Sequence, residues 1–279
     1  MDTPAANAQL AMLLEVAGTP KPGNVDRDRD LPGLRFEHFL AGTVGAGEGL
    51  RGAADGASIG EAFERAVDGM ARQRGGNTQF GTLLLLVPLV AAADDGGVDP
   101  DAVSAVVEDT TVDDAADFYR AFDHVDVAVE DPPAEGEAPD VRRGSDAVAT
   151  VHERDLTLYD VLAESAPGDG VAREWVEGFE RTFGAAEYLA AGRGPASDLA
   201  AETFLWLLSR EPDTLVATKH GERTARRVMV RAQEARADTI DHVEALAKSL
   251  VAEGINPGTT ADLTAAALFV ALQRGDLVV

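Results

Sequence analysis

The spacing of apolar residues predicts one helix after another along this 279-residue chain. After Pro4, apolar side chains return every three or four residues up to Ala17, and Gly18 follows as a stop signal. Runs of strand length in which apolar and polar residues alternate are almost absent, and 124–130 comes nearest to one. The pattern predicts an all-α fold, in a single globular multi-helix domain over 1–279.

The stretch 82–93, TLLLLVPLVAAA, is the most apolar part of the chain. It is shorter than the roughly 20 residues that a bilayer-spanning helix needs, and Pro88 interrupts it. We therefore expect a buried central helix here. Other helices are predicted near Phe36, after Ser58, Asp99, Thr111, Thr157 and Asp169, and within 204–208, 224–252 and 261–272, with Trp175, Val176, Phe179 and Phe183 on one face and a loop over 130–150.

The chain carries 49 Asp and Glu residues against 24 Lys and Arg, a formal net charge of −25. An acidic surface opposes nonspecific binding to nucleic acid or to an anionic membrane. It favours a salt-rich environment, where the Debye length falls to about 3 Å at 1 M and self-repulsion is screened, so we expect a halophilic source. The chain has no cysteine, which excludes disulfides and thiolate metal sites. Its opening residues do not resemble a signal peptide, so we expect a cytoplasmic protein.

Segment 19–30, TPKPGNVDRDRD, interrupts the helical pattern with a dense set of charges. Pro20 and Pro22 restrict the backbone and Gly23 permits unusual conformations, which predicts a stiff loop without helix. Carboxylates bind Mg²⁺ through oxygen, and Lys or Arg pairs with phosphate, so the segment suits a metal-bound phosphate ligand. A solvated loop held by its own ion pairs is the alternative.

Segment 72–81, RQRGGNTQFG, lies between two predicted helices. Its paired glycines would let backbone N–H groups approach a ligand, and the following helix N-terminus favours negative charge, so phosphate could bind beside the arginines. The spacing does not match the Walker P-loop. Capping of the helix by Asn77 and Thr78 is the alternative.

Segments 211–221 and 255–263 also lie at predicted helix ends. The former places Lys219 and His220 just before Gly221, and the latter reads INPGTTADL. Cations commonly finish helices and Gly commonly follows them, so a helix terminus and a turn explain both segments without a ligand.

Together, the four segments resemble the triphosphoribosyl-dephospho-CoA synthase family, whose bacterial members make the prosthetic-group precursor of citrate lyase and malonate decarboxylase. The matching text is TPKPGNVDR, GGNTQFG, DTLVATKHG and INPGTTADLTAAALF, in the same order along nearly the whole chain. The resemblance implies an all-α enzyme that moves a triphosphoribosyl group from ATP to the ribose 2′-hydroxyl of 3′-dephospho-CoA and releases adenine.

The chain departs from the bacterial pattern in three of these segments. Bacterial relatives usually continue after VDR into Gly, His and Asp-Met, where this chain has DRDLP. They carry NTHKG in place of NTQFG, and DTN with RGG in place of DTL with KHG. These variants resemble an archaeal-type branch, and they leave open whether the acceptor is dephospho-CoA or a related molecule.

Displacement of adenine from ribose passes through an oxocarbenium-like sugar. It requires a carboxylate near C1′, a base for the attacking hydroxyl, and cations or metal on the triphosphate. We assign Asp26 and Asp213 as candidate catalytic carboxylates, and Asp28 and Asp30 as candidate Mg²⁺ ligands. The candidate phosphate and nucleotide ligands are Lys21, Arg27, Arg74, Gly75, Gly76, Asn77, Lys219 and His220.

Two other functions fit the same residues. One is a different nucleotide-dependent transferase of cofactor biosynthesis, and the other is a noncatalytic helical protein that binds a nucleotide. Free adenine as a product indicates glycosyl transfer, pyrophosphate indicates nucleotidyl transfer, and a binding protein releases neither.

Overall fold

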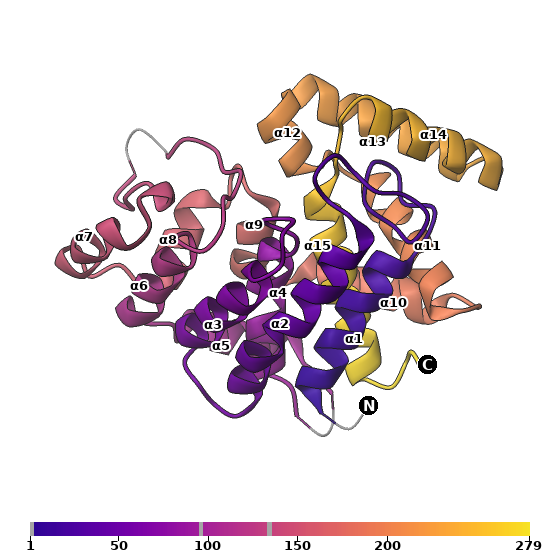
Figure 1. Ribbon diagram of the computed structural model, residues 1–279. Coiled ribbons are helices and arrows are strands. Elements are labelled where there is room, and N and C mark those ends of the chain that lie inside the picture. The colour runs from indigo at the N-terminus through magenta and orange to yellow at the C-terminus, as the bar shows by residue number, and fades with distance from the viewer. Residues whose placement is uncertain (1–2, 95–96, 133–135) are drawn as a thin grey trace.

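The computed structural model describes residues 3–94, 97–132 and 136–279, and within them the chain forms fifteen α-helices and one 3-10 helix with no strand beyond isolated bridges (Figure 1). The all-α prediction is confirmed. The helices are α1 (Pro4–Ala17), α2 (Phe36–Ala54), α3 (Ile59–Ala71), α4 (Phe80–Ala91), α5 (Pro100–Glu108), α6 (Val112–Ala121), η1 (Val141–Ala147), α7 (Val148–Glu153), α8 (Leu158–Ser165), α9 (Gly170–Val176), α10 (Glu180–Ala191), α11 (Ala196–Leu208), α12 (Thr214–His220), α13 (Glu222–Arg236), α14 (Ile240–Ala252) and α15 (Gly258–Gln273).

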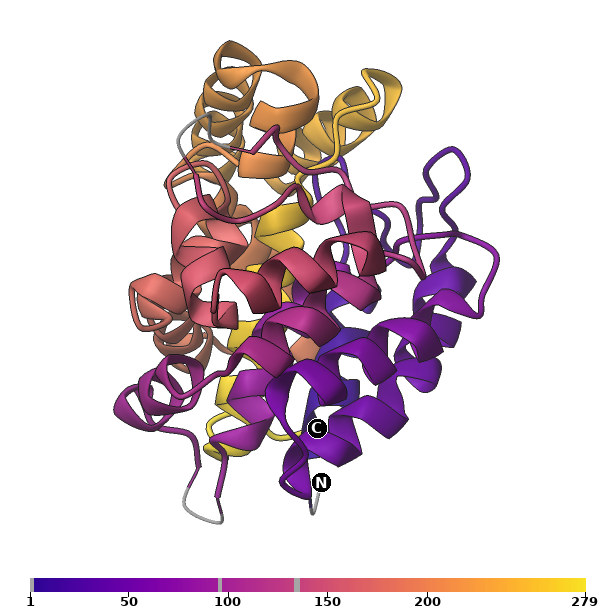
Figure 2. The same ribbon diagram turned by 90° about the vertical axis from the view of Figure 1, so that its left-hand side faces the viewer.

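Two helices, α4 and α15, lie at the centre of the molecule and pack against each other. Every residue of α4 from Leu83 to Val90 is buried, which confirms the predicted central helix. The partner α15 is likewise buried at every residue from Leu263 to Ala271, and it also packs against α1, α10 and α11 (Figures 1 and 2). The core is therefore built around a pair of buried helices.

Capping residues fix several helix starts as the sequence predicts. Thr3 caps α1 and accepts a hydrogen bond from the backbone N–H of Ala6, directly before Pro4 at the first helical position. Thr111 and Asp114 form a reciprocal capping box at the start of α6. Each such cap satisfies a backbone N–H that the helix itself leaves without a partner.

The structure differs from the predicted pattern at two breaks. Phe179 adopts a left-handed conformation with φ of 60°, which ends α9 and starts α10, so Val176 is 40% exposed and does not share a face with the buried Phe183. The single helix predicted over 224–252 divides into α13 and α14. The stretch 124–130 pairs with no strand among the described residues and instead forms part of a cavity wall.

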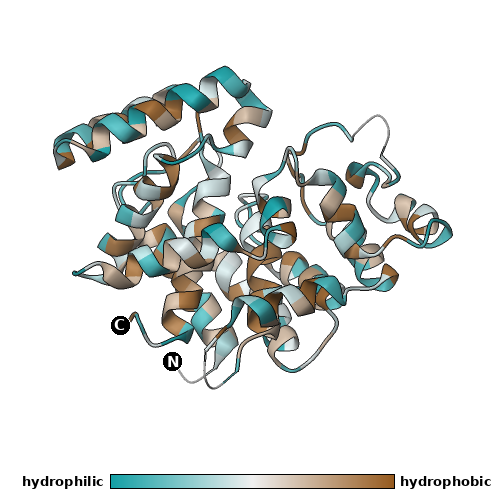
Figure 3. Cartoon of the chain, turned by 180° about the vertical axis from the view of Figure 1, so that it is seen from behind, coloured by the Kyte–Doolittle hydropathy of each residue, from teal (hydrophilic) through white to brown (hydrophobic). Residues whose placement is uncertain are grey.

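Helices α12, α13 and α14 form a layer above the central pair (Figure 1). Their apolar residues, with Phe204 and Leu208 of α11, form a separate buried cluster. In Figure 3 hydrophobic residues concentrate in the central helices, whereas hydrophilic residues are frequent on this layer. None of the helices in the described part of the chain is both long and apolar enough to cross a membrane.

We expect the folded protein to lose stability as salt is removed. With 49 acidic against 24 basic side chains, surface carboxylates repel one another over a Debye length of roughly 30 Å at 0.01 M, and molar salt screens this repulsion. Thermal unfolding followed by circular dichroism from 3 M to 0.01 M KCl measures the effect. An unfolding temperature that does not change with salt would contradict the halophilic interpretation, which remains a prediction.

Candidate active site

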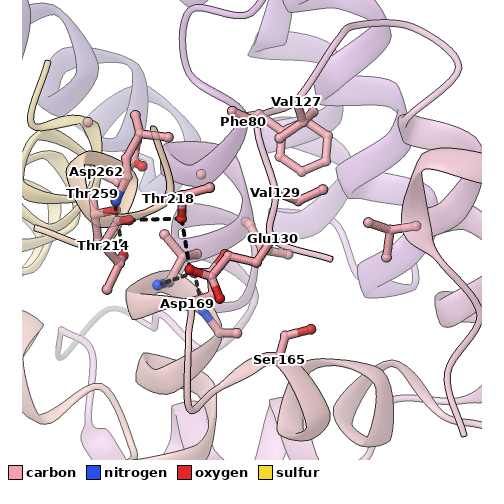
Figure 4. Close-up of a pocket in the computed structure, with 18 of the residues that line it drawn as sticks. Phe80, Val127, Val129, Glu130, Ser165, Asp169, Thr214, Thr218, Thr259 and Asp262 are labelled. Carbon is pink, nitrogen blue, oxygen red and sulfur yellow. Dashed lines mark hydrogen bonds between the residues drawn. The ribbon is translucent and has the colours of Figure 1, made fainter. Parts of the chain in front are cut away.

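A cavity of about 1080 Å³ opens where the first turns of α4 and α15 meet the start of α9, helix α12 and the segment 126–132. One side of the cavity is polar and the opposite side is apolar. Thr214, Thr218 and Asp262 lie on one side, and Phe80 and Val127 lie on the other (Figure 4). The cavity thus offers a polar surface with carboxylates and hydroxyls opposite an apolar surface.

Asp262, in the second turn of α15, is the carboxylate that the central helices place on the polar side. The Thr82 hydroxyl of α4 donates a hydrogen bond of 2.6 Å to its Oδ1. Gly81 makes room for it, because a Cβ there would stand 2.2 Å from Asp262 Oδ2. Burial raises the pKa of Asp262 to about 8, and the nearby carboxylates of Glu15 and Asp169 act in the same direction.

Asp169 lines the cavity at the N-terminus of α9. Its Oδ1 accepts hydrogen bonds from the backbone N–H groups of Val171 and Ala172, at 2.7 and 3.2 Å. Burial raises the pKa of Asp169, and these two bonds oppose the rise because they stabilise the ionised form. Asp169 thus holds its proton more readily than an exposed aspartate does.

A row of hydroxyls joins α9, α12 and α15 along the same wall. Thr214 accepts from the backbone N–H of Gly170 at 3.0 Å, and its hydroxyl lies 3.0 Å from that of Thr259. One turn further along α12, Thr218 donates to Glu130 of the opposite segment at 3.4 Å. These contacts fix three helix ends around one polar surface (Figure 4).

Glu15 and Lys21 form a buried ion pair behind this wall. Lys21 is fully buried with its Nζ bonded to Glu15 and 5.7 Å from the centre of the Phe204 ring. Burial raises the pKa of Glu15, and the positive charge of Lys21 opposes that rise. Lys21 therefore holds the Glu15 carboxylate at the cavity surface rather than lining the cavity itself.

We expect Lys21→Met to destabilise the protein by about 3–5 kcal/mol, because the buried Glu15 carboxylate loses its partner. The loss should grow as pH rises above the pKa of an unfolded glutamate, since the unfolded chain then ionises Glu15 freely and the folded variant resists it. Denaturant unfolding at pH 5 and pH 8 measures both effects. Lys248→Met, at an exposed lysine with no carboxylate partner among the described residues, is the control. Equal stability of the two variants would contradict the role of Lys21.

The predicted catalytic residues Asp26 and Asp213 are buried and hold the backbone. Asp26 accepts hydrogen bonds from the backbone N–H groups of Lys21 at 3.0 Å and Asp28 at 2.9 Å, and from the Arg29 guanidinium at 2.6 Å. It therefore closes segment 19–30 on itself. It is not one of the described lining residues, so its catalytic assignment stays a prediction.

Asp213 caps α12 through the N–H of Val216 at 3.0 Å and joins it to α15 through two bonds of 2.8 Å from Thr260. Burial raises the pKa of Asp213 against these bonds. Like Asp26, it is not one of the described residues of the main cavity wall. Its geometry suits holding α12 against α15, and its catalytic assignment also stays a prediction.

Among the predicted nucleotide ligands, Asn77 and Lys219 line the cavity. Gly75 lies against the ring of His38. Lys21 is buried and lies outside the described lining. The remaining predicted ligands also lie outside that lining and are exposed: Arg27, Arg74, Gly76 and His220. The structure thus brings one predicted ligand from each of segments 72–81 and 211–221 to the same cavity.

The predicted metal ligands Asp28 and Asp30 are exposed and lie outside the described lining. Asp30 accepts a hydrogen bond of 2.9 Å from the N–H of Phe36 and so caps α2. Across the described residues, no three His, Cys, Asp or Glu side chains are arranged to hold a metal ion. The assignment of this pair to Mg²⁺ stays a prediction.

Three carboxylates of the cavity wall are not among the site residues predicted from the sequence: Asp262, Asp169 and Glu15. A signal for Asp262 was present, because an ionisable residue inside an otherwise apolar helix is costly unless it is used. Glu15 is likewise an ionisable residue among buried apolar side chains, near the end of α1. Nothing in the sequence separates Asp169 from an ordinary helix cap.

Charge is distributed very unevenly around the cavity. Among the described lining residues Lys219 is the single cation. Eight are carboxylates: Glu15, Asp126, Glu130, Asp131, Asp140, Glu164, Asp169 and Asp262. Two buried polar atoms of the wall, Thr78 Oγ1 and Asn256 Oδ1, have no hydrogen-bond partner among the described residues. Buried polar groups are normally paired, so both atoms suit contacts to a bound molecule.

The family model for ATP:dephospho-CoA triphosphoribosyl transferases matches residues 1–277. The structure is also similar to a crystal structure from Archaeoglobus fulgidus, provisionally assigned as a triphosphoribosyl-dephospho-CoA synthase, with 30% sequence identity and a TM-score of 0.70. That similarity covers 85% of this chain and 99% of the other. A comparison with curated proteins found no match. The family match extends over nearly the whole sequence, and the chain belongs to the ATP:dephospho-CoA triphosphoribosyl transferase family.

Proposed function

We propose that the cavity is the site at which this enzyme moves the triphosphoribosyl group of ATP to 3′-dephospho-CoA and releases adenine. The observation that carries the proposal is Asp262, a half-buried carboxyl with a pKa of about 8 that faces a large cavity beside two other carboxylates. Glycosyl transfer requires negative charge near an oxocarbenium-like carbon and a proton donor for the leaving group. Asp262 and Asp169 together supply both.

In the reaction the bond between C1′ and adenine N9 breaks, and a bond forms between C1′ and the 2′-oxygen of the acceptor. Asp262, largely protonated at pH 7, donates a proton to the leaving adenine. Asp169 accepts the proton of the attacking hydroxyl, and its negative charge before that transfer stabilises the positive sugar. The proton lost by the acceptor thus balances the proton gained by adenine.

Asp26 and Asp213 act as positioning residues in this scheme. Asp26 keeps the backbone of Lys21 in place, and Lys21 in turn holds Glu15 beside the cavity. Asp213 ties the start of α12 to α15 and directly precedes Thr214, whose hydroxyl lies on the cavity wall. The two aspartates therefore act on the cavity through the helix ends that carry its lining residues.

Mg²⁺ fits the oxygen-rich lining, because it prefers carboxylate, phosphate and water oxygens and the described lining holds no histidine. Bound to a triphosphate, it needs only one or two protein carboxylates. Glu130, bonded to Thr218 next to Lys219, is the carboxylate that would hold it. When bound, Mg²⁺ neutralises phosphate charge and so lets a triphosphate enter an acidic cavity.

Product analysis tests the proposed function. The enzyme is incubated in concentrated KCl with ATP, Mg²⁺ and dephospho-CoA, and all products are identified by mass spectrometry. We expect free adenine and an acceptor whose mass has increased by one triphosphoribosyl group. Pyrophosphate without adenine would instead indicate nucleotidyl transfer, and no product from any nucleotide would indicate a binding protein.

Thr82→Val should move the alkaline limb of the pH profile of turnover to higher pH, by up to about one unit. The Thr82 hydroxyl donates to Asp262 and so favours its ionised form, and removal of that donor raises the pKa of Asp262 further. Turnover measured from pH 6 to 10 locates the limb. Thr264→Val is the matched control, because the buried Thr264 hydroxyl, among the residues that the structure describes, bonds only to the Thr260 carbonyl of its own helix. An alkaline limb that stays in place or moves to lower pH would contradict the assignment of Asp262.

A further inference from the structure

A basic corner lies where α12 turns into α13, beside the acidic cavity. Between residues 219 and 236 the chain has six Lys or Arg residues and two Glu, although acidic residues outnumber basic ones two to one overall. Gly221, with φ of 82°, makes the turn between the two helices. The corner forms the end of the layer above the central pair (Figures 1 and 2).

Part of this charge has an internal partner. Arg231 is bonded to Glu253 at 2.8 Å, Arg227 lies 3.9 Å from the same carboxylate, and Arg236 lies over the ring of Tyr188. These arginines fasten α13 to α14 and to α10. Their charge therefore needs no further ligand.

Two further cations of the corner, Lys219 and Arg223, have no carboxylate within ion-pair distance among the described residues. Arg226 approaches only Glu222, at 3.5 Å, and both side chains are exposed. An exposed pair of this kind contributes little. The corner thus presents several unneutralised cations on a protein that is otherwise rich in carboxylates.

These cations are close to the mouth of the cavity. Lys219 lines it, and Arg223 follows four residues later, so their Cα atoms are at most about 14 Å apart. Arg223 and Arg226 are three residues apart on α13 and therefore lie on one face of that helix. Like charges at this spacing destabilise an isolated helix, so folding alone gives no reason for the arrangement.

We propose that Arg223 and Arg226, together with Lys219, bind the phosphate groups of a nucleotide substrate at the mouth of the cavity. The inference rests on the proposed function, since both ATP and dephospho-CoA carry linked phosphates. With eight carboxylates and one cation among the described lining residues, the cavity itself repels such groups. Arginine pairs with phosphate through two parallel hydrogen bonds, and the corner supplies two arginines next to the one lysine that reaches inside.

Charge-reversal variants test the corner. Arg223→Glu lies in the first turn of α13, where an acidic side chain suits the helix dipole, and Arg226→Glu changes an exposed side chain of the second turn, so both should fold. Arg193→Glu is the matched control: it makes the same change in net charge at an exposed arginine of the connection between α10 and α11, which lies well below α12 in Figures 1 and 2. Calorimetric titration in one high-salt buffer gives the affinity of each variant for ATP, dephospho-CoA and adenosine.

We expect each corner variant to weaken binding of at least one phosphate-bearing ligand by roughly tenfold, as for the loss of a charge-assisted contact, and to leave adenosine binding unchanged. The ligand affected identifies whose phosphates the corner holds. Unchanged affinity for both ATP and dephospho-CoA would overturn the proposal, as would an equal loss for adenosine or for the Arg193 variant. Wild-type enzyme that released no adenine would instead count against the proposed function, so the two failures are distinguishable.

Discussion

Asp262→Asn is expected to lower turnover by roughly 10²–10⁴-fold, the range for loss of a general acid. The same change should stabilise the protein above pH 8. The folded-state pKa of about 8 lies above the unfolded value of about 3.9, so the folded protein keeps a proton that the unfolded chain releases. Asp262 therefore costs stability progressively as pH rises from about 4 to about 8, and asparagine removes that cost.

Denaturant unfolding at pH 6 and pH 9, with turnover measured on the same samples, checks both expectations. We expect the variant to exceed wild type in unfolding free energy at pH 9 by roughly 1–3 kcal/mol. Asp276→Asn, at an exposed aspartate near the C-terminus, is the control and should change neither quantity. An Asp262 variant that kept near wild-type turnover would exclude the carboxyl from the reaction.

The second large effect is expected for Asp26→Asn, and it is mainly on stability. An amide keeps the size of the carboxylate but removes one of the two negative charges that pair with Arg29, and it cannot accept as many N–H bonds. Breaking a buried, hydrogen-bonded ion pair costs about 3–5 kcal/mol. Turnover per folded molecule should fall by less than about tenfold, because Asp26 acts on the cavity only through Lys21 and Glu15.

Unfolding free energy and turnover of the Asp26 variant distinguish the two roles considered for this residue. A catalytic or metal-binding Asp26 predicts a large loss of turnover with stability intact, the reverse of the result expected here. Asp28→Asn is the control, because this neighbouring carboxylate is exposed and makes one long contact, of 3.3 Å with Thr19. It should change the unfolding free energy by at most about 0.5 kcal/mol.

Much of the fold follows from local sequence signals. Thr3 with Pro4, and Thr111 with Asp114, fix helix starts because a polar side chain or a proline there resolves a local hydrogen-bonding problem. The break at Phe179 could not be predicted in this way. A left-handed phenylalanine is unfavourable locally, and its complete burial in the core compensates for that cost.

The segments that surround the cavity could be predicted from the sequence, but the role of each residue in them could not. Segments 19–30, 72–81, 211–221 and 255–263 do meet around the first turns of α4 and α15. Yet Asp26 and Arg29 pair with each other, and Lys21 pairs with Glu15 outside the segment. The buried charges of segment 19–30 therefore stabilise a loop and do not by themselves indicate a ligand site. Asp262 has fewer charged neighbours in sequence, and its place inside a helix rich in apolar residues was the one local signal for it. Its raised pKa follows from tertiary burial, which a local pattern does not record.

A crystal structure of the Asp262→Asn variant, grown in concentrated salt with ATP and dephospho-CoA, would show whether the cavity beside residue 262 binds the reacting nucleotide. The distance that matters is between C1′ of the ATP ribose and the side chain of residue 262. We predict that ATP lies in the cavity with this distance near 4 Å, with its triphosphate toward Lys219 and the acceptor 2′-hydroxyl on the side of Asp169. ATP bound instead against the exposed side of segment 19–30, with the cavity free of nucleotide, would contradict the account.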